Sequence, residues 1–338
     1  MNSYLFYPGC SMQRSARPYL DSLLAIRQDI SIVLEEVQDW NCCGATEYFS
    51  VARLPAYALI GRNLALAEQQ ANGSHVLAAA CSACYLNLAK TDKYMRQDST
   101  LSEQINQALA AGGLHYDAGA IQVRHLLDII YNDVGLEAIK QRVVKPLKGL
   151  RVAPYYGCMI VRPDPDNRFN SPEYPHSMDK LLQALGAEVI DYPLKTHCCG
   201  GHMTQISPPV AYELIRRLLD AAEQYRADVM VTLCPMCQLN LDAYQEDTNR
   251  HFKTDYHLPI LYFTQLMGLA FGHEAAELGL GREFVSAAAA LAKIGVEAPA
   301  EPAAPAAPAA PVAPTVRRRK DDRSLPMPRM PVDAEDVK

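Results

Sequence analysis

Residues 75–88 read HVLAAACSACYLNL, in which a short apolar run leads directly into Cys81 and Cys84. Residues 228–241 read DVMVTLCPMCQLNL and repeat this order, with Cys234 and Cys237 in the matching places. A short apolar run that ends at a loop is typical of a buried strand. Each stretch therefore predicts a strand, a cysteine loop and a helix, in that order.

All ten cysteines of the 338-residue chain belong to two copies of one arrangement. The first copy comprises Cys10, Cys42, Cys43, Cys81 and Cys84. The second copy comprises Cys158, Cys198, Cys199, Cys234 and Cys237. Matched cysteines lie 148 to 156 residues apart, which indicates a duplicated chain with modest insertions. Each half therefore needs five thiolates gathered at one point.

Strands and helices alternate around these cysteines. We expect further strands at 3–7, 32–37, 150–156 and 188–192, and helices at 17–28, 50–71, 177–185 and 209–224. Residues 121–130 and 260–269 each read as a strand that passes into a helix. The alternation predicts an α/β fold of two duplicated Rossmann-like βαβ domains with mainly parallel sheets. Ligands gather beyond the carboxyl ends of such strands, and the cysteine loops lie there.

This organisation divides the chain into three parts. We expect a first cysteine-rich domain at 1–148, a second at 149–295, and a disordered Pro/Ala-rich tail at 296–338. From Glu297 a proline recurs about every third residue over much of the tail, which removes backbone donors and opposes a regular helix.

Composition excludes several classes of function. The net charge of −6 gives no reason to expect a nucleic-acid partner. No signal peptide is evident, and no stretch approaches the ~20 apolar residues of a membrane span. We therefore expect a cytoplasmic protein without an integral membrane segment. Because that compartment is reducing, its cysteines are expected to serve metal or redox chemistry rather than disulfides.

Five thiolates in each half suit an iron–sulfur cluster better than zinc. A structural zinc site uses four ligands, so zinc would leave one cysteine of each set over. Adjacent cysteines such as Cys42 and Cys43 can instead reach different irons of one cluster. A zinc site and a thiol relay without metal stay open as alternatives.

The doubled pattern resembles the cysteine-rich CCG domain, and two copies in one chain resemble the B subunit of heterodisulfide reductase. The stretches that carry the resemblance are YPGC at 7–10, WNCCG at 40–44, YYGCMIVRP at 155–163 and LCPMCQLNLD at 233–242. The resemblance implies two noncubane [4Fe-4S] clusters, one in each half, each bound by the five cysteines of that half. It also implies an oxidoreductase that reduces, or reversibly forms, a disulfide held between the clusters.

Partners are expected because the chain has no dinucleotide fingerprint and no ferredoxin-type cysteine run. The resemblance implies a ferredoxin-like HdrC-type subunit and a flavin-containing HdrA-type subunit. It implies a thiol or disulfide substrate, with a lipoyl carrier protein as one candidate. The alternative is an electron-transfer or anchor subunit of a succinate or fumarate reductase, or of a similar quinone-linked complex.

Three polar residues flank the second cysteine pair and are candidates for catalysis. Lys195 and His197 precede Cys198, and His202 follows Cys199. These side chains could bind an anionic thiol substrate or donate protons to the leaving thiolates. Alternatively, they solvate the loops or donate hydrogen bonds to cluster sulfides without touching a substrate.

Overall fold

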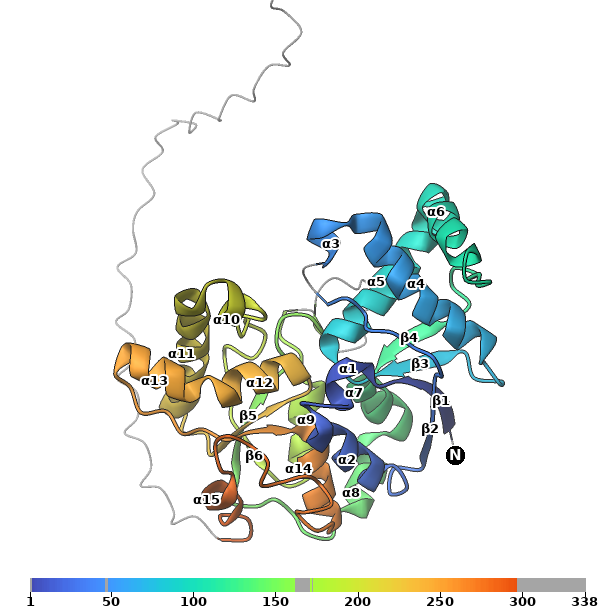
Figure 1. Cartoon of the computed structure of the whole chain (residues 1–338). Helices are drawn as coiled ribbons and strands as arrows, with labels where there is room; N and C mark the ends of the chain where they lie inside the picture. Colours follow the sequence, from blue (N-terminus) through green and yellow to red (C-terminus); the bar gives the residue numbers. More distant parts are fainter. Residues whose placement is uncertain (1, 46–47, 162–170, 172, 297–338) are drawn as a thin grey trace, which may run out of the picture. The chain divides into compact units, whose positions relative to one another are not determined.

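The computed structural model describes residues 2–45, 48–161, 171 and 173–296, and residues 1–297 form one compact unit (Figure 1). The tail that we predict at 296–338 lies outside the described residues from 297 onward. Among the described residues, none of the helices combines the length and the apolar character that crossing a membrane requires.

Two four-stranded parallel sheets form the framework, and they confirm the duplicated α/β fold. The first sheet has the order β2-β1-β3-β4, with β1 at Asn2–Tyr7, β2 at Ile32–Glu36, β3 at Val76–Ala79 and β4 at Gln122–His125. The second has the order β6-β5-β7-β8, with β5 at Arg151–Tyr155, β6 at Glu188–Val189, β7 at Val229–Thr232 and β8 at Ile260–Tyr262. The central strands are buried, as expected for a parallel sheet with helices on its faces.

Helices connect the strands of both sheets. In the first half they are α1 (Gly9–Met12), α2 (Arg17–Ile26), α3 (Tyr48–Val51), α4 (Arg53–Gln69), α5 (Ser82–Gln97), α6 (Ser99–Ala110), α7 (Leu126–Ile129), the π-helix η1 (Ile130–Val134) and α8 (Leu136–Arg142). In the second half they are α9 (Ser177–Ala184), α10 (Met203–Ile206), α11 (Pro208–Gln224), α12 (Pro235–Ala243), α13 (Gln245–Phe252), α14 (Phe263–Phe271) and α15 (Ala288–Leu291).

The expected strands at 3–7, 32–37 and 150–156 and the expected helices at 17–28, 177–185 and 209–224 agree with the structure within two residues, and two other elements differ by more. The helix expected at 50–71 is divided into α3 and α4, because Ala52 has an extended backbone with φ −151° and ψ 93°. The strand expected at 188–192 is shorter, since the amide of Tyr192 bonds the carbonyl of Ile190 and turns the chain away from the sheet.

The two halves pack against each other through helices that follow their outer and first strands. Helix α2 packs against α14, and α7 contacts α9 in the matching way. At the first contact the rings of Tyr19 and Tyr262 stack with centroids 4.4 Å apart, and the hydroxyls of Ser22 and Thr264 lie 2.6 Å apart. This packing brings the carboxyl ends of both sheets toward one region.

Candidate metal centre

Every cysteine group lies beyond the carboxyl end of a strand, where the sequence pattern places it. In the first half, Cys10 lies in α1 just after β1, the Cys42-Cys43 pair follows β2, and Cys81 follows β3. The second half repeats this with Cys158 after β5, the Cys198-Cys199 pair after β6, and Cys234 after β7. The second cysteine of each Cys-x-x-Cys lies in the first turn of α5 or α12.

The sulfur atoms form contacting pairs within each half. Cys43 Sγ lies 3.4 Å from Cys84 Sγ, and the matching pair of Cys199 and Cys237 is 3.5 Å apart. Cys10 Sγ and Cys42 Sγ are 3.6 Å apart. All ten cysteines are free in the structure.

The two sulfur sets meet at Cys81 and Cys234. The two thiols interact across the boundary between the halves, since the Cys234 thiol raises the pKa of Cys81. Cys81 also interacts with Cys84, and Cys234 with Cys237, so buried, mutually interacting sulfurs connect the two sets. Exposed sulfurs remain at Cys10, Cys42 and Cys198. The arrangement therefore has a buried centre and an accessible rim.

Matching polar contacts hold the loops in both halves. The Tyr7 hydroxyl donates to the carbonyl of Asn41, and the Tyr155 hydroxyl donates to that of His197, each at 2.7 Å. Burial, and then the nearby sulfurs, raise the pKa of both tyrosines, so both stay protonated donors. In each half, this hydrogen bond connects the end of the first strand with the residue before the cysteine pair.

Two asparagines brace the buried cysteines, and sequence reasoning missed them. Asn87 Nδ2 donates to the carbonyl of Cys43 at 3.1 Å, and Asn240 Nδ2 donates to that of Cys199 at 3.3 Å. Both asparagines are buried. They occupy the same place in the repeated LNL stretches at 86–88 and 239–241, and that repetition was the signal that could have found them.

Glycine is required before each lone cysteine. Gly9 and Gly157 have φ of +73° and +70°. A Cβ on Gly9 would lie 2.9 Å from Cys84 Sγ, and one on Gly157 would lie 3.0 Å from Cys237 Sγ. A side chain at either position would displace a sulfur of the same half.

The thiols of each half lie so close together that a nearby positive charge is needed for all of them to ionise. The adjoining Cys43 sulfur, together with Cys81 and burial, raises the pKa of Cys84. The adjoining Cys199 sulfur does the same to the pKa of Cys237. Full ionisation of each set is therefore unfavourable without a cation, whereas a bound metal keeps coordinating thiols deprotonated.

The donor set fits a group of several metal atoms. Across residues 2–45, 48–161, 171 and 173–296, no three or more His, Cys, Asp or Glu side chains gather as ligands of one metal ion. The closest sulfurs within a half lie 3.4 to 3.6 Å apart, and each thiolate of a multi-iron cluster can bind a different iron. The residues present therefore fit an iron–sulfur cluster in each half.

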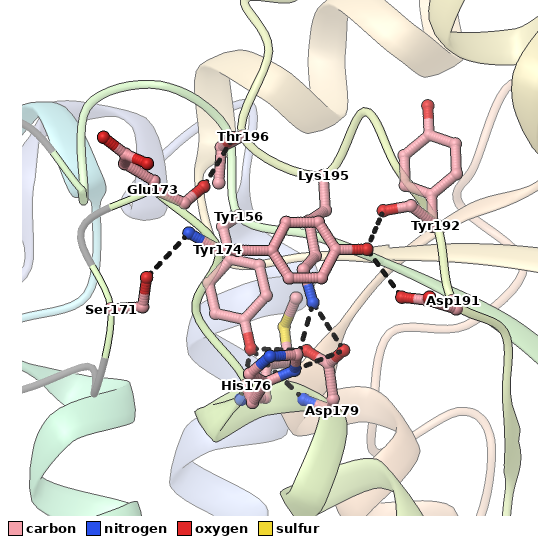
Figure 2. Close-up of polar contacts among 11 residues, drawn as sticks. Tyr156, Ser171, Glu173, Tyr174, His176, Asp179, Asp191, Tyr192, Lys195 and Thr196 are labelled. Atoms are coloured by element: carbon pink, nitrogen blue, oxygen red, sulfur yellow. Dashed lines mark hydrogen bonds and ion pairs between the residues drawn. The ribbon is translucent and has the colours of Figure 1, made fainter. Parts of the chain in front are cut away.

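The three flanking candidates have different surroundings. The side chain of Lys195 is fully buried, with its Nζ 2.8 Å from Asp179 Oδ1 and 3.8 Å from the ring centroid of Tyr174 (Figure 2). His197 is exposed beside Cys198, and His202 is half-buried at the start of α10. A catalytic role for these residues stays a prediction.

Lys195 also belongs to a polar network that no sequence pattern indicated. Its carbonyl accepts from the amides of Tyr156 and Gly157, at 2.8 and 3.0 Å. The Tyr156 hydroxyl donates to Asp179 Oδ2 at 2.6 Å and accepts from the amide of Met178 at 2.7 Å (Figure 2). The network connects the loop before Cys198 with the segment that carries Cys158.

The chain matches a known domain family and several known proteins. The cysteine-rich domain called CCG matches residues 4–89 and 152–242. A fumarate reductase subunit of Wolinella succinogenes, named "8-methylmenaquinol:fumarate reductase membrane anchor subunit", is 36% identical over 284 residues, which are 84% of this chain and 97% of that protein.

Two Methanosarcina proteins are similar over comparable lengths. The B subunit of the ferredoxin:CoB-CoM heterodisulfide reductase of Methanosarcina mazei is 30% identical over 87% of this chain and 97% of its own. The B subunit of the ferredoxin/F(420)H(2)-dependent CoB-CoM heterodisulfide reductase of Methanosarcina acetivorans is 32% identical over 79% and 88%.

Among solved structures, a hypothetical protein from Helicobacter pylori shares the fold with a TM-score of 0.66 at 14% identity. The match covers 84% of this chain and 52% of that one, so this chain spans about half the length of that protein.

Proposed function

Because the chain belongs to the CCG cysteine-rich domain family and is similar to the B subunits of heterodisulfide reductases over most of its length, we propose that it is the catalytic iron–sulfur subunit of a heterodisulfide-reductase-like complex. The complex would reduce, or reversibly form, a disulfide. The observation that carries this proposal is the interaction of Cys81 with Cys234, which joins two equivalent sulfur sets at one place.

Each half would hold one noncubane [4Fe-4S] cluster through its five cysteines. A bound cluster of this kind supplies electrons one at a time. Reduction of one disulfide takes two electrons and two protons, breaks one S–S bond and yields two thiols. Two electron sources that face one site allow both sulfur atoms to be reduced there, without release of a thiyl radical. The meeting of the two sets would then give a reason for the duplicated cysteine pattern.

The residues around the sulfurs would hold the cysteine segments in place, keep water from the buried centre and return protons to the product thiolates. The buried cysteines exclude water from the centre, and the exposed rim at Cys10, Cys42 and Cys198 gives access. His197 is exposed next to that rim and could return a proton to a product thiolate. His202 is the second candidate donor. Lys195, with its ammonium on Asp179, would act by holding the Cys158 segment in place.

Partner subunits would supply the electrons. We propose that a ferredoxin-like HdrC-type subunit is the immediate donor and that a flavin-containing HdrA-type subunit supplies it in turn. The reverse direction, oxidation of a thiol or persulfide such as one on a lipoyl carrier protein, uses the same residues.

A second candidate is an electron-transfer or anchor subunit of a quinone-linked fumarate or succinate reductase. The relative from Wolinella succinogenes favours it, because that protein is 36% identical over 84% of this chain. In this case the two clusters would pass electrons between a quinone and a partner flavoprotein, and no disulfide would be reduced.

Anaerobic purification of the complex from its own cells tests these proposals. We expect about four irons and four sulfides for each half of the chain, and a flavoprotein with a ferredoxin-like subunit among the co-purifying chains. Reduced viologen dye should drive reduction of a small disulfide. A succinate dehydrogenase flavoprotein as partner, with menaquinone-linked activity and no disulfide turnover, would support the second candidate instead. Zinc without sulfide would refute both.

A further inference from the structure

One buried tyrosine hydroxyl faces the backbone next to the inner cysteines of both halves. Tyr19 lies in α2, and its side chain is fully buried. Its hydroxyl donates a hydrogen bond to the carbonyl of Ala80 at 3.1 Å and lies 3.5 Å from the carbonyl of Leu233. Ala80 directly precedes Cys81, and Leu233 directly precedes Cys234. A single hydroxyl therefore contacts the segments of the two cysteines that interact across the boundary between the halves.

The ring of Tyr19 is fixed by residues of the second half. It stacks on the ring of Tyr262 with an interplanar angle of 9°, and it packs edge-on against Phe263 with ring centroids 6.0 Å apart. The buried hydroxyls of Ser22 and Thr264 meet in the same packing of α2 against α14. Burial, and then the nearby Tyr262 and inner sulfurs, raise the pKa of Tyr19, so its hydroxyl stays a protonated donor.

The second half has no equivalent of this hydroxyl. The stretches YLDSLL at 19–24 and SMDKLL at 177–182 align α2 with α9, and Ser177 stands at the place of Tyr19. Ser177 is fully buried, and its hydroxyl has no hydrogen-bond partner among the described residues. The tyrosine, glycine and asparagine contacts that hold the cysteines are present in both halves. A contact that is made once and shared by both halves acts on their separation rather than on either sulfur set.

We propose that Tyr19 is a positioning residue that sets the separation of Cys81 and Cys234, and with it the electronic coupling between the clusters of the two halves. Ala80 and Leu233 lie one residue beyond the ends of β3 and β7. A shift of either carbonyl therefore moves the cysteine that follows it. Two one-electron donors reduce one disulfide only if both act at one place, so their separation matters to the reaction. This inference rests on the proposed function, since it needs a cluster in each half.

Low-temperature electron paramagnetic resonance of the anaerobically purified, fully reduced protein tests the coupling, because two nearby paramagnetic clusters split or broaden each other's signals. Cys198→Ser, with half of the iron, gives the reference spectrum without coupling. Tyr19→Phe keeps the stacked ring and removes the donor. Because His125 also hydrogen-bonds the backbone of Ala80, that carbonyl keeps a partner and the variant loses the link to Leu233. We expect Tyr19→Phe to retain all of the iron and to lose part or all of the splitting.

Tyr192→Phe is the matched control. Tyr192 is also fully buried, and its hydroxyl donates to a backbone carbonyl, that of Leu218, at 2.8 Å within the second half. Loss of one such hydrogen bond should raise the unfolding equilibrium constant about fivefold in either variant, as measured by urea unfolding. The splitting should change in Tyr19→Phe and stay at its wild-type value in Tyr192→Phe.

An unchanged or larger splitting in Tyr19→Phe would overturn the inference, and so would an equal change in Tyr192→Phe. Loss of iron from Tyr19→Phe would overturn it as well, because the hydroxyl would then hold a cluster rather than a separation. A wild-type spectrum without coupling would leave nothing for Tyr19 to set. The two proposals can fail separately. A splitting that depends on Tyr19, without any disulfide turnover, refutes the proposed function, whereas turnover with a splitting independent of Tyr19 refutes only this inference.

Discussion

Replacement of Lys195 by methionine should destabilise the second half far more than an equivalent change in the first. The Lys195 side chain is 0% exposed and that of Asp179 is 9% exposed, so the pair is shielded from water. Lys195→Met leaves the Asp179 carboxylate buried, with the Tyr156 hydroxyl as a remaining donor. Removal of one partner of a buried ion pair costs about 3 to 5 kcal/mol, because the other charge stays behind.

The duplicated chain offers a matched control. Asp39 stands three residues before its cysteine pair, as Lys195 does in the second half. Asp39 also forms an ion pair, with Arg62, but its side chain is 77% exposed. Such a pair contributes about 1 kcal/mol or less, so Asp39→Asn should be nearly neutral.

Urea unfolding under anaerobic conditions, followed by circular dichroism and by iron release, measures both effects. We expect Lys195→Met to lower the free energy of unfolding by about 3 kcal/mol or more and to lose about half of the bound iron. The double variant Lys195→Met, Asp179→Asn should lose less free energy of unfolding than the two single variants together, since both members of the pair are removed. Equal losses of unfolding free energy for Lys195→Met and Asp39→Asn would refute the reasoning. Full iron content and unchanged stability of Lys195→Met would refute it as well.

Three more outcomes test the site and the packing of the halves. Cys198→Ser should retain the fold, lose about half of the iron and abolish disulfide turnover, as measured by iron analysis and dye-linked assay; persistent turnover would contradict a mechanism that needs both clusters. Gly157→Ala should lose the iron of the second half, whereas Gly73→Ala, at φ +84° with nothing within 4 Å of a Cβ, should keep all of it. Burial alone would lower the pKa of His273, but hydrogen bonds with Asp29 and an adjacent carboxylate raise it above 6.5. The contact of protonated His273 with these carboxylates therefore stabilises the fold fully below pH 6.5, and the stabilisation is lost as the pH rises through the raised pKa. Thermal unfolding between about pH 6 and 9 should show this loss in the wild type and not in His273→Gln.

The positions of the strands and of the cysteine loops were predictable because both depend on local patterns. Residues 75–80 and 228–233 are apolar runs that end at cysteine, and the structure has β3 and β7 there. The parallel arrangement follows from helices between consecutive strands. Helix bounds were less predictable, because the break at Ala52 reflects a backbone angle that residue preferences do not specify.

Contacts between distant segments were not predictable. The ion pair of Lys195 joins a loop to α9, and nothing in the local sequence around either residue requires it. The interaction of the Cys81 thiol with that of Cys234 depends on how α2 and α14 pack, through the stacked rings of Tyr19 and Tyr262. Such contacts are decided by side-chain shape at the interface, which single-chain periodicity does not encode.

The contacts that hold the cysteines are the same in both halves, whereas the residues around the two cysteine sets differ. A duplicated scaffold with identical surroundings would give two equivalent sulfur sets, and neither would favour one end of a substrate. Here a buried lysine, Lys195, supports the loop before the second cysteine pair, whereas the residue at the matching place in the first half, Asp39, is 77% exposed. Unequal surroundings around equal ligands are expected to give the two sets different electrostatic environments. Under the proposed function, that inequality would give the two sulfur atoms of a bound disulfide different surroundings.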